Sequence, residues 1–182
     1  MEITFNELSK ESPDRKKIEK LYYSAFPSNE IIPLWFLKWK ANRGKAKFYS
    51  ILDEKKWVGF IYIIKHNNIL FVLYFAIDSN IQSKGYGGSV LSKLKEQFPG
   101  DRIILFVESP DGSAANQEQR IKRIRFYKKH EFKESGYKMK EGQTVYELLE
   151  FGHPVSPIEF RTLIKKYTGS ILSLFFKYNL YK

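Results

Sequence analysis

The feature that most constrains the fold is a glycine-rich turn between an apolar strand and an amphipathic helix. The strand-like run Ile69–Ile77 is followed, after Asp78, by Gly85, Gly87 and Gly88. The first four N–H groups of a helix have no internal partner, and the helix dipole adds partial positive charge there. Glycine lets a ligand approach the backbone closely and accepts positive φ. The sequence therefore predicts either an anion site, holding the pyrophosphate of a nucleotide-like cofactor, or an ordinary strand-to-helix turn.

The order of the periodic segments predicts an α/β (α+β) fold with a mixed sheet. The expected strands are Ile3–Phe5, Lys47–Leu52, Trp57–Lys65, Ile69–Ile77, Arg102–Glu108, Phe132–Met139 and Thr144–Phe151. The expected helices are one capped by Ser12 and ending near Pro27, one from Pro33 to Asn42, one from Gly87 to Phe98, one over Asn116–His130, and one capped by Ser156.

Two of these strands, Ile69–Ile77 and Arg102–Glu108, are continuously apolar, which is typical of strands covered on both faces. A helix separates them in the sequence. They are therefore expected to form a parallel strand–helix–strand unit.

Composition excludes several classes of site. The chain has no cysteine, so disulfides, thiolate zinc sites and a cysteine nucleophile are ruled out. Its three histidines, His66, His130 and His153, lie far apart without acidic neighbours at ligand spacing, so no metal site is expected. The first residues lack the pattern of a signal peptide, and no apolar run approaches the ~20 residues of a membrane span. We expect a cytoplasmic protein.

The formal net charge of +11 raises the question of an anionic partner. Lysines are scattered along the chain, and the densest basic run is Arg120–Lys129. Lysines spread along the chain in this way favour a solvated surface with one anion site over a nucleic-acid-binding groove.

One face of the helix expected over Asn116–His130 is polar. Asn116, Arg120, Arg123 and Tyr127 are spaced by four, three and four residues and so share a face, whereas Ile121 and Ile124 can turn to the core. Such a face either lines a cofactor channel or is a solvated face that ends in a half-buried tyrosine. The glycine turn favours the channel.

The segment Gln82–Gly87 resembles the Arg/Gln-x-x-Gly-x-Gly/Ala signature of the GNAT acyltransferase superfamily, and it lies at the same place in the element order. A second segment, Asn116 followed by Arg125–Phe132, resembles the later helix-to-strand segment of that family. Its His130-Glu131 replaces the commoner Asn-Gly. The resemblance covers residues 1–151 in element order, with specific motifs only in Ile77–Ser89 and Asn116–Phe132. We expect a GNAT domain over 1–151 and a helical extension over 152–182, packed on that domain or at an interface.

The resemblance implies a splayed central sheet flanked by helices, and transfer of an acetyl group from acetyl-CoA to a primary amine of a small molecule or peptide. It implies that the pyrophosphate binds to the backbone of the glycine turn, with the charge of Lys84 nearby. The pantetheine arm would pair with the end of the preceding strand. The cofactor-binding residues so implied are Phe75, Ala76, Ile77, Gln82, Ser83, Lys84, Gly85, Tyr86, Gly87, Gly88, Ser89, Asn116, Arg123 and Tyr127.

Acetyl transfer needs a neutral amine, but an amine of pKa about 10 is mostly protonated at neutral pH. Glu108, at the end of its strand, is the candidate base, acting through water; the alternative is a solvated strand-end carboxylate. Tyr127 is the candidate acid for the departing thiolate. Glu30, between the first two helices, is the candidate acceptor-side residue.

Two questions stay open at the level of the sequence. The alternative function is a non-catalytic CoA-binding domain of the same fold, or a nucleic-acid-associated regulatory one. The apolar tail Ile171–Tyr181 predicts a core or homodimer contact rather than a membrane-surface helix. The sequence does not specify the amine acceptor.

Overall fold

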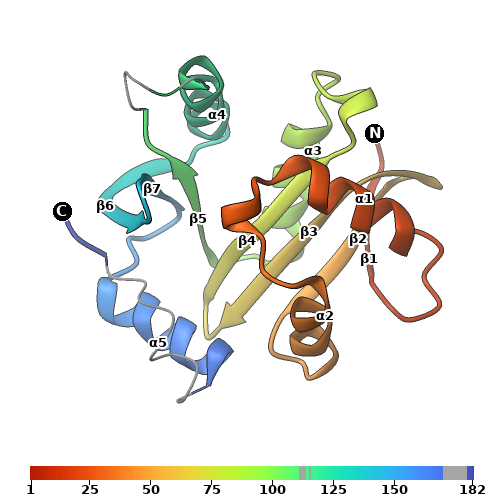
Figure 1. Ribbon diagram of the computed structural model, residues 1–182, viewed down its shortest axis with the longest axis horizontal. Helices are drawn as coiled ribbons and strands as arrows, with labels where there is room; N and C mark the ends of the chain where they lie inside the picture. Colours follow the sequence, from red (N-terminus) through yellow and green to blue (C-terminus); the bar gives the residue numbers. More distant parts are fainter. Residues whose placement is uncertain (111–113, 115, 170–179) are drawn as a thin grey trace. The chain divides into compact units, whose positions relative to one another are not determined.

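The computed structural model describes residues 1–110, 114, 116–169 and 180–182. Within these ranges the chain forms seven β-strands and five α-helices, which confirms the predicted mixed α/β fold (Figure 1). The elements group into two compact units. The first unit contains residues 1–64 and 72–99, and the second contains residues 65–71 and 100–182.

The strands of the first unit lie in the order β1-β2-β3-β4. The pairs β1–β2 and β2–β3 are antiparallel. Most side chains of β3 are buried, in a run rather than in alternation, as expected for a strand covered on both faces. The bounds are β1 Ile3–Glu7, β2 Lys47–Asp53, β3 Lys56–His66 and β4 Ile69–Ile77.

The helices of the first unit are α1 Arg15–Ala25, α2 Leu34–Asn42 and α3 Tyr86–Gln97. Helix α1 buries Ile18, Leu21 and Tyr22, whose spacing places them on one face of the helix. The predicted cap of α1 is wrong, because Asp14 rather than Ser12 is the N-cap residue. The Ser12 hydroxyl instead accepts a hydrogen bond from the Ser9 N–H at 2.8 Å, so it closes the preceding loop.

The second unit contains β5 Arg102–Glu108, α4 Gln117–Lys129, β6 Lys133–Glu141, β7 Thr144–Phe151 and α5 Pro157–Thr168. Strand β5 pairs antiparallel with β7, and β7 pairs antiparallel with β6. The register of β6 shifts between Glu134 and Lys138, where Gly136 has a φ of +79°. At the end of the chain, Tyr181 pairs with Lys138.

Ser156 caps helix α5, as predicted, and the cap is a capping box that Ser156 forms with Glu159. The Ser156 hydroxyl accepts from the Glu159 N–H, and the Glu159 carboxylate accepts from the Ser156 N–H. The ring of Phe160 is fully buried and lies 5.6 Å from that of Phe71 and 5.5 Å from that of Phe106. Aromatic packing therefore attaches α5 to the core of the second unit.

The predicted apolar tail Ile171–Tyr181 lies outside the described residues, except for its last two. Among the described helices, none has both the length and the apolar character that crossing a bilayer requires.

Candidate active site

The glycine turn leads from the end of β4 at Ile77 to the start of α3 at Tyr86. Gly85 is the N-cap of α3 and has a φ of +86°, in the left-handed region that glycine adopts without a Cβ clash. The backbone N–H groups of Gly85, Tyr86, Gly87 and Gly88 donate no hydrogen bond within the described part of the chain. Four unpaired donors at a helix N-terminus suit a bound oxyanion.

The turn is held in place by side chains from its own ends and from a neighbouring strand. The Gln82 amide donates to the Ile77 carbonyl at 3.0 Å, and the Tyr86 hydroxyl donates to the Asp53 carboxylate at 3.1 Å. The Met1 thioether lies 3.3 Å from the Ser89 hydroxyl. Lys84 is exposed and carries its charge on the same loop.

The end of β4, where Phe75, Ala76 and Ile77 are the candidate pantetheine contacts, is held very close to β3. A Cβ placed on Gly59 would lie 2.2 Å from the Ala76 carbonyl oxygen, which is far inside van der Waals contact. The Asp78 N–H donates to the Val58 carbonyl at 2.9 Å. Only glycine fits at position 59 with this path of β4.

A cluster of polar side chains joins the end of β5 to α4. Glu108 is buried; its Oε1 pairs with Arg120 at 2.9 Å, and its Oε2 pairs with Arg123 at 3.3 Å. The Asn116 amide donates to Oε2 at 3.3 Å, and its carbonyl accepts from the Arg120 Nε at 2.8 Å. Arg120 also donates to the Ser109 carbonyl at 3.0 Å. The structure thus brings together three of the four residues of the predicted polar face.

Tyr127, the fourth residue of that face, lies among aromatic side chains instead. Its ring is 5.1 Å from that of Phe126 and 5.6 Å from that of Phe132, and only 8% of the residue is exposed. Within the described residues its hydroxyl makes no hydrogen bond. Burial raises the pKa of Tyr127 to about 12, although the Arg123 charge lowers it in part. The phenol therefore stays protonated at neutral pH.

Glu30 belongs to a short segment that two tyrosines hold by its backbone. The Tyr74 hydroxyl donates to the Glu30 carbonyl at 2.6 Å, and the Tyr22 hydroxyl donates to the Ile32 carbonyl at 2.8 Å. The Ile32 N–H contacts both hydroxyls, at 3.0 Å to Tyr22 and 3.3 Å to Tyr74. Burial raises the pKa of Tyr22, so this donor remains protonated.

Sequence reasoning left out three residues that build these arrangements. Arg120 was seen only as one member of a polar face, yet it makes the shortest ion pair with Glu108. Tyr22 in α1 and Tyr74 in β4 have no role that the sequence predicts. The signal that was available for the tyrosines is that a buried hydroxyl needs a hydrogen-bond partner.

The chain is thus a mixed α/β protein in which a glycine turn places unpaired N–H groups at the start of a helix. The chain belongs to the acetyltransferase (GNAT) family, whose sequence model matches residues 14–132.

Solved structures with the same fold agree with this assignment. A protein from Bacteroides thetaiotaomicron that is assigned to the GNAT family has a TM-score of 0.71 at 24% identity, over 93% of this chain and 98% of its own. A chimeric spermidine N-acetyltransferase from Vibrio cholerae has a TM-score of 0.61 at 16% identity, over 83% and 95% of the two chains. A GNAT acetyltransferase from Elizabethkingia anophelis with acetyl-CoA bound has a TM-score of 0.58 at 14% identity, over 83% and 98%. No protein with a curated description matches the sequence.

Proposed function

We propose that the chain is an N-acetyltransferase that moves the acetyl group of acetyl-CoA to a primary amine of a small molecule or peptide. The observation that carries the proposal is the set of four unpaired N–H groups from Gly85 to Gly88 at the start of α3. In a chain of this family, a pyrophosphate is the anion that such a site suits.

Acetyl-CoA supplies an acyl thioester when it is bound. The residues proposed to hold its phosphates are those of the turn Gln82–Ser89, where Lys84 adds a cation. Its pantetheine arm would pair with the backbone of Phe75, Ala76 and Ile77, as an added strand pairs with an edge. Asn116, Arg123 and Tyr127 are proposed to complete the cofactor contacts.

The reaction needs a proton to leave the attacking amine. As nitrogen bonds to the acetyl carbon, the carbon–sulfur bond breaks and a thiolate departs. Glu108 is the proposed base. Its two oxygens have about four acceptor positions in total. Arg120, Arg123 and Asn116 occupy three of them. The remaining position, on Oε1, can hold a water that carries the proton from the amine.

Tyr127 is proposed to stabilise the departing thiolate. A phenol of pKa about 12 is a weaker acid than a thiol, whose reference pKa is about 8.5. Full proton transfer to the thiolate would therefore be uphill. A hydrogen bond from the Tyr127 hydroxyl has no such cost, and the hydroxyl makes no hydrogen bond with the described residues that would compete. We therefore infer that Tyr127 donates a hydrogen bond to the departing thiolate and does not transfer its proton to it.

The acceptor side is proposed to include the segment around Glu30, which Tyr22 and Tyr74 fix by its backbone. A fixed segment keeps the acceptor amine in one position relative to the thioester, and such positioning contributes a large part of the rate of two-substrate reactions.

The test is a panel of primary amines and peptides, each incubated with the protein and acetyl-CoA, with release of free CoA as the readout. Release above the rate without protein supports the transferase. In a parallel measurement acetyl-CoA is titrated against the protein alone. Binding without release by any amine would favour the non-catalytic CoA-binding alternative, and absence of binding would refute the cofactor assignment.

A further inference from the structure

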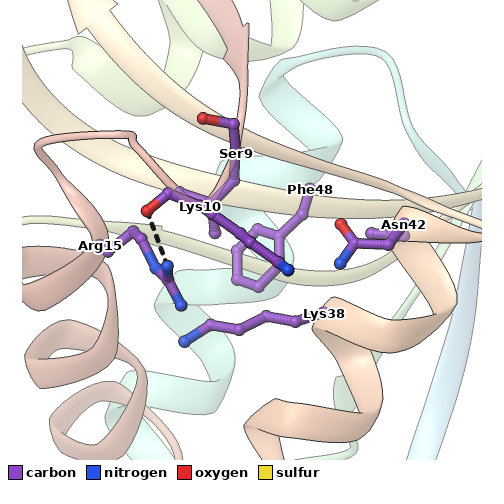
Figure 2. A pocket seen from close by; sticks show the side chains of 8 residues that line it. Ser9, Lys10, Arg15, Lys38, Asn42 and Phe48 are labelled. Carbon is purple, nitrogen blue, oxygen red and sulfur yellow. Dashed lines mark hydrogen bonds between the residues drawn. The ribbon is translucent and has the colours of Figure 1, made fainter.

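A second basic site lies in the first unit, in a pocket formed by residues that the proposed acetyl transfer does not use. The pocket is a depression that is open to solvent: its enclosed cavity is about 30 Å³, and the space within its walls is about 290 Å³ when the adjoining open solvent is counted. Figure 2 shows Lys10, Arg15 and Lys38 reaching it from the loop after β1, the start of α1 and the middle of α2. The full lining is Leu8, Ser9, Lys10, Arg15, Lys38, Ala41, Asn42 and Phe48.

The loop that supplies Lys10 is fixed before any ligand binds. The Leu8 N–H donates to the Phe48 carbonyl at 2.7 Å, which attaches the start of the loop to β2. The Ser9 N–H donates to the Ser12 hydroxyl at 2.8 Å, and the Glu11 N–H donates to the Ser9 hydroxyl at 3.2 Å. A pocket that is already ordered loses little conformational freedom on binding.

The three cations of the pocket have little compensation from the protein. One Arg15 Nη donates to the Lys10 carbonyl at 2.7 Å, which orients its guanidinium. The Lys38 ammonium lies 3.8 Å from the Glu19 carboxylate, the one ion pair among these three cations within the described residues. The Lys10 ammonium and the Asn42 amide make no hydrogen bond with the described chain. Because like charges repel, three cations around one pocket favour an anionic occupant.

The geometry points to a binding site for a phosphoryl group, carried by a small phosphate monoester or by free phosphate. A guanidinium presents paired N–H donors to neighbouring phosphate oxygens, and two ammonium groups add point charges. The Asn42 amide adds a neutral donor. The wall formed by Phe48 and Leu8 is apolar, which suits the organic part of an ester. This site is independent of the proposed acetyl transfer.

The test is a two-dimensional NMR titration with orthophosphate and, separately, with phenyl phosphate, at constant ionic strength. Amide signals of Lys10, Asn42 and Phe48 report on the pocket, whereas those of Gly85–Ser89 report on the glycine turn. We expect saturable shifts at the pocket signals. Phenyl phosphate binding at least tenfold tighter identifies an ester as the ligand, and equal affinities identify free phosphate.

The matched variants use a charge change of the same size. Lys10→Gln together with Lys38→Gln should weaken binding at the pocket signals at least tenfold. The control double variant removes the same number of charges elsewhere: it combines Lys55→Gln in the exposed β2–β3 turn with Lys84→Gln in the glycine turn. It should change phosphate binding at the pocket less than twofold. Absence of saturable shifts at the pocket in the parent protein would overturn the site. An equal loss in the two double variants would also overturn it, because binding would then follow net charge alone.

Discussion

At the residue scale, the Tyr127 hydroxyl is a group without a structural task in the described chain. Its ring packs between Phe126 and Phe132, so Tyr127→Phe keeps the packing and removes only the oxygen. We expect turnover to fall roughly 100-fold, within the usual range for loss of one hydrogen-bond donor to a charge that develops in the transition state. The dissociation constant of acetyl-CoA should change less than threefold. Steady-state kinetics and calorimetric titration check both values, and an unchanged turnover would remove Tyr127 from the reaction.

Glu108 has two candidate roles, and one substitution separates them. Glu108→Gln keeps the size of the side chain but removes the charge between Arg120 and Arg123. As the proposed base, Glu108 should be needed for turnover, so we expect kcat at pH 7 to fall about 100-fold or more with acetyl-CoA affinity nearly unchanged. The opposite result, weaker acetyl-CoA binding with little change in kcat, would assign Glu108 to holding the two arginines. Circular dichroism of the variant controls for loss of folding.

At the element scale, the path of β4 depends on a glycine in the neighbouring strand. In Gly59→Ala the new Cβ would meet the Ala76 carbonyl at 2.2 Å, so the backbone of β3 or β4 must move. We expect a loss of stability of about 1–3 kcal/mol, typical of overpacking, and acetyl-CoA binding at least tenfold weaker. Chemical denaturation and calorimetric titration measure the two effects. The control is Gly142→Ala in the β6–β7 turn, where a Cβ meets nothing within 4 Å but φ is +58°: stability should fall and affinity should not.

The capping box of α5 predicts how stability varies with pH. The hydrogen bond from Arg102, with further ones from Ser156, lowers the pKa of Glu159 to about 2, whereas an unfolded glutamate titrates near 4.3. The unfolded state therefore takes up the proton first, and the stabilisation is complete above about pH 4.3 and is lost as the pH falls toward 2. Glu159 is partly exposed, so solvent weakens the effect.

We expect the stability difference between the parent protein and Glu159→Gln to be constant from pH 7 to about 5 and to shrink below that. Urea denaturation at each pH measures it. Glu118→Gln is the control, because that carboxylate lies in an exposed pair with Lys122 on α4. A difference that stays constant down to pH 3 would contradict the prediction.

Elements that depend on local patterns could be predicted from the sequence, and contacts between distant residues could not. The bounds of β4, β5 and β7 match the expected ranges because runs of apolar residues and turn signals are local. The predicted cap of α1 is wrong because the Ser12 hydroxyl accepts a hydrogen bond from the Ser9 N–H inside the preceding loop. Capping propensity alone does not tell whether a serine hydroxyl will bond to the helix or to its own loop. The hydrogen bond between the Tyr74 hydroxyl and the Glu30 carbonyl joins residues 44 positions apart, so the periodicity of the sequence does not predict it. The same holds for Tyr127, whose place on a polar face of the helix did not predict an aromatic cluster.

At the scale of the whole molecule, the net charge of +11 should act on the cofactor, because coenzyme A is an anion. Ligand at 100 times its dissociation constant stabilises a protein by about 2.7 kcal/mol. For a chain of this size that corresponds to a rise in Tm of about 5–10 °C. We expect such a rise with acetyl-CoA at about 50 mM NaCl.

The salt dependence of that rise tests whether charge contributes to binding. At about 1 M NaCl the screening length falls to ~3 Å, so the attraction between the lysine-rich surface and the ligand is largely lost. We expect acetyl-CoA to bind about tenfold more weakly there, which removes about 1.4 kcal/mol of the stabilisation, or about half of the rise in Tm. The protein without ligand, heated at both salt concentrations, corrects for the effect of salt on folding. An equal rise at both concentrations would mean that binding rests on the directed N–H groups of Gly85–Gly88 alone, with no contribution from the net charge.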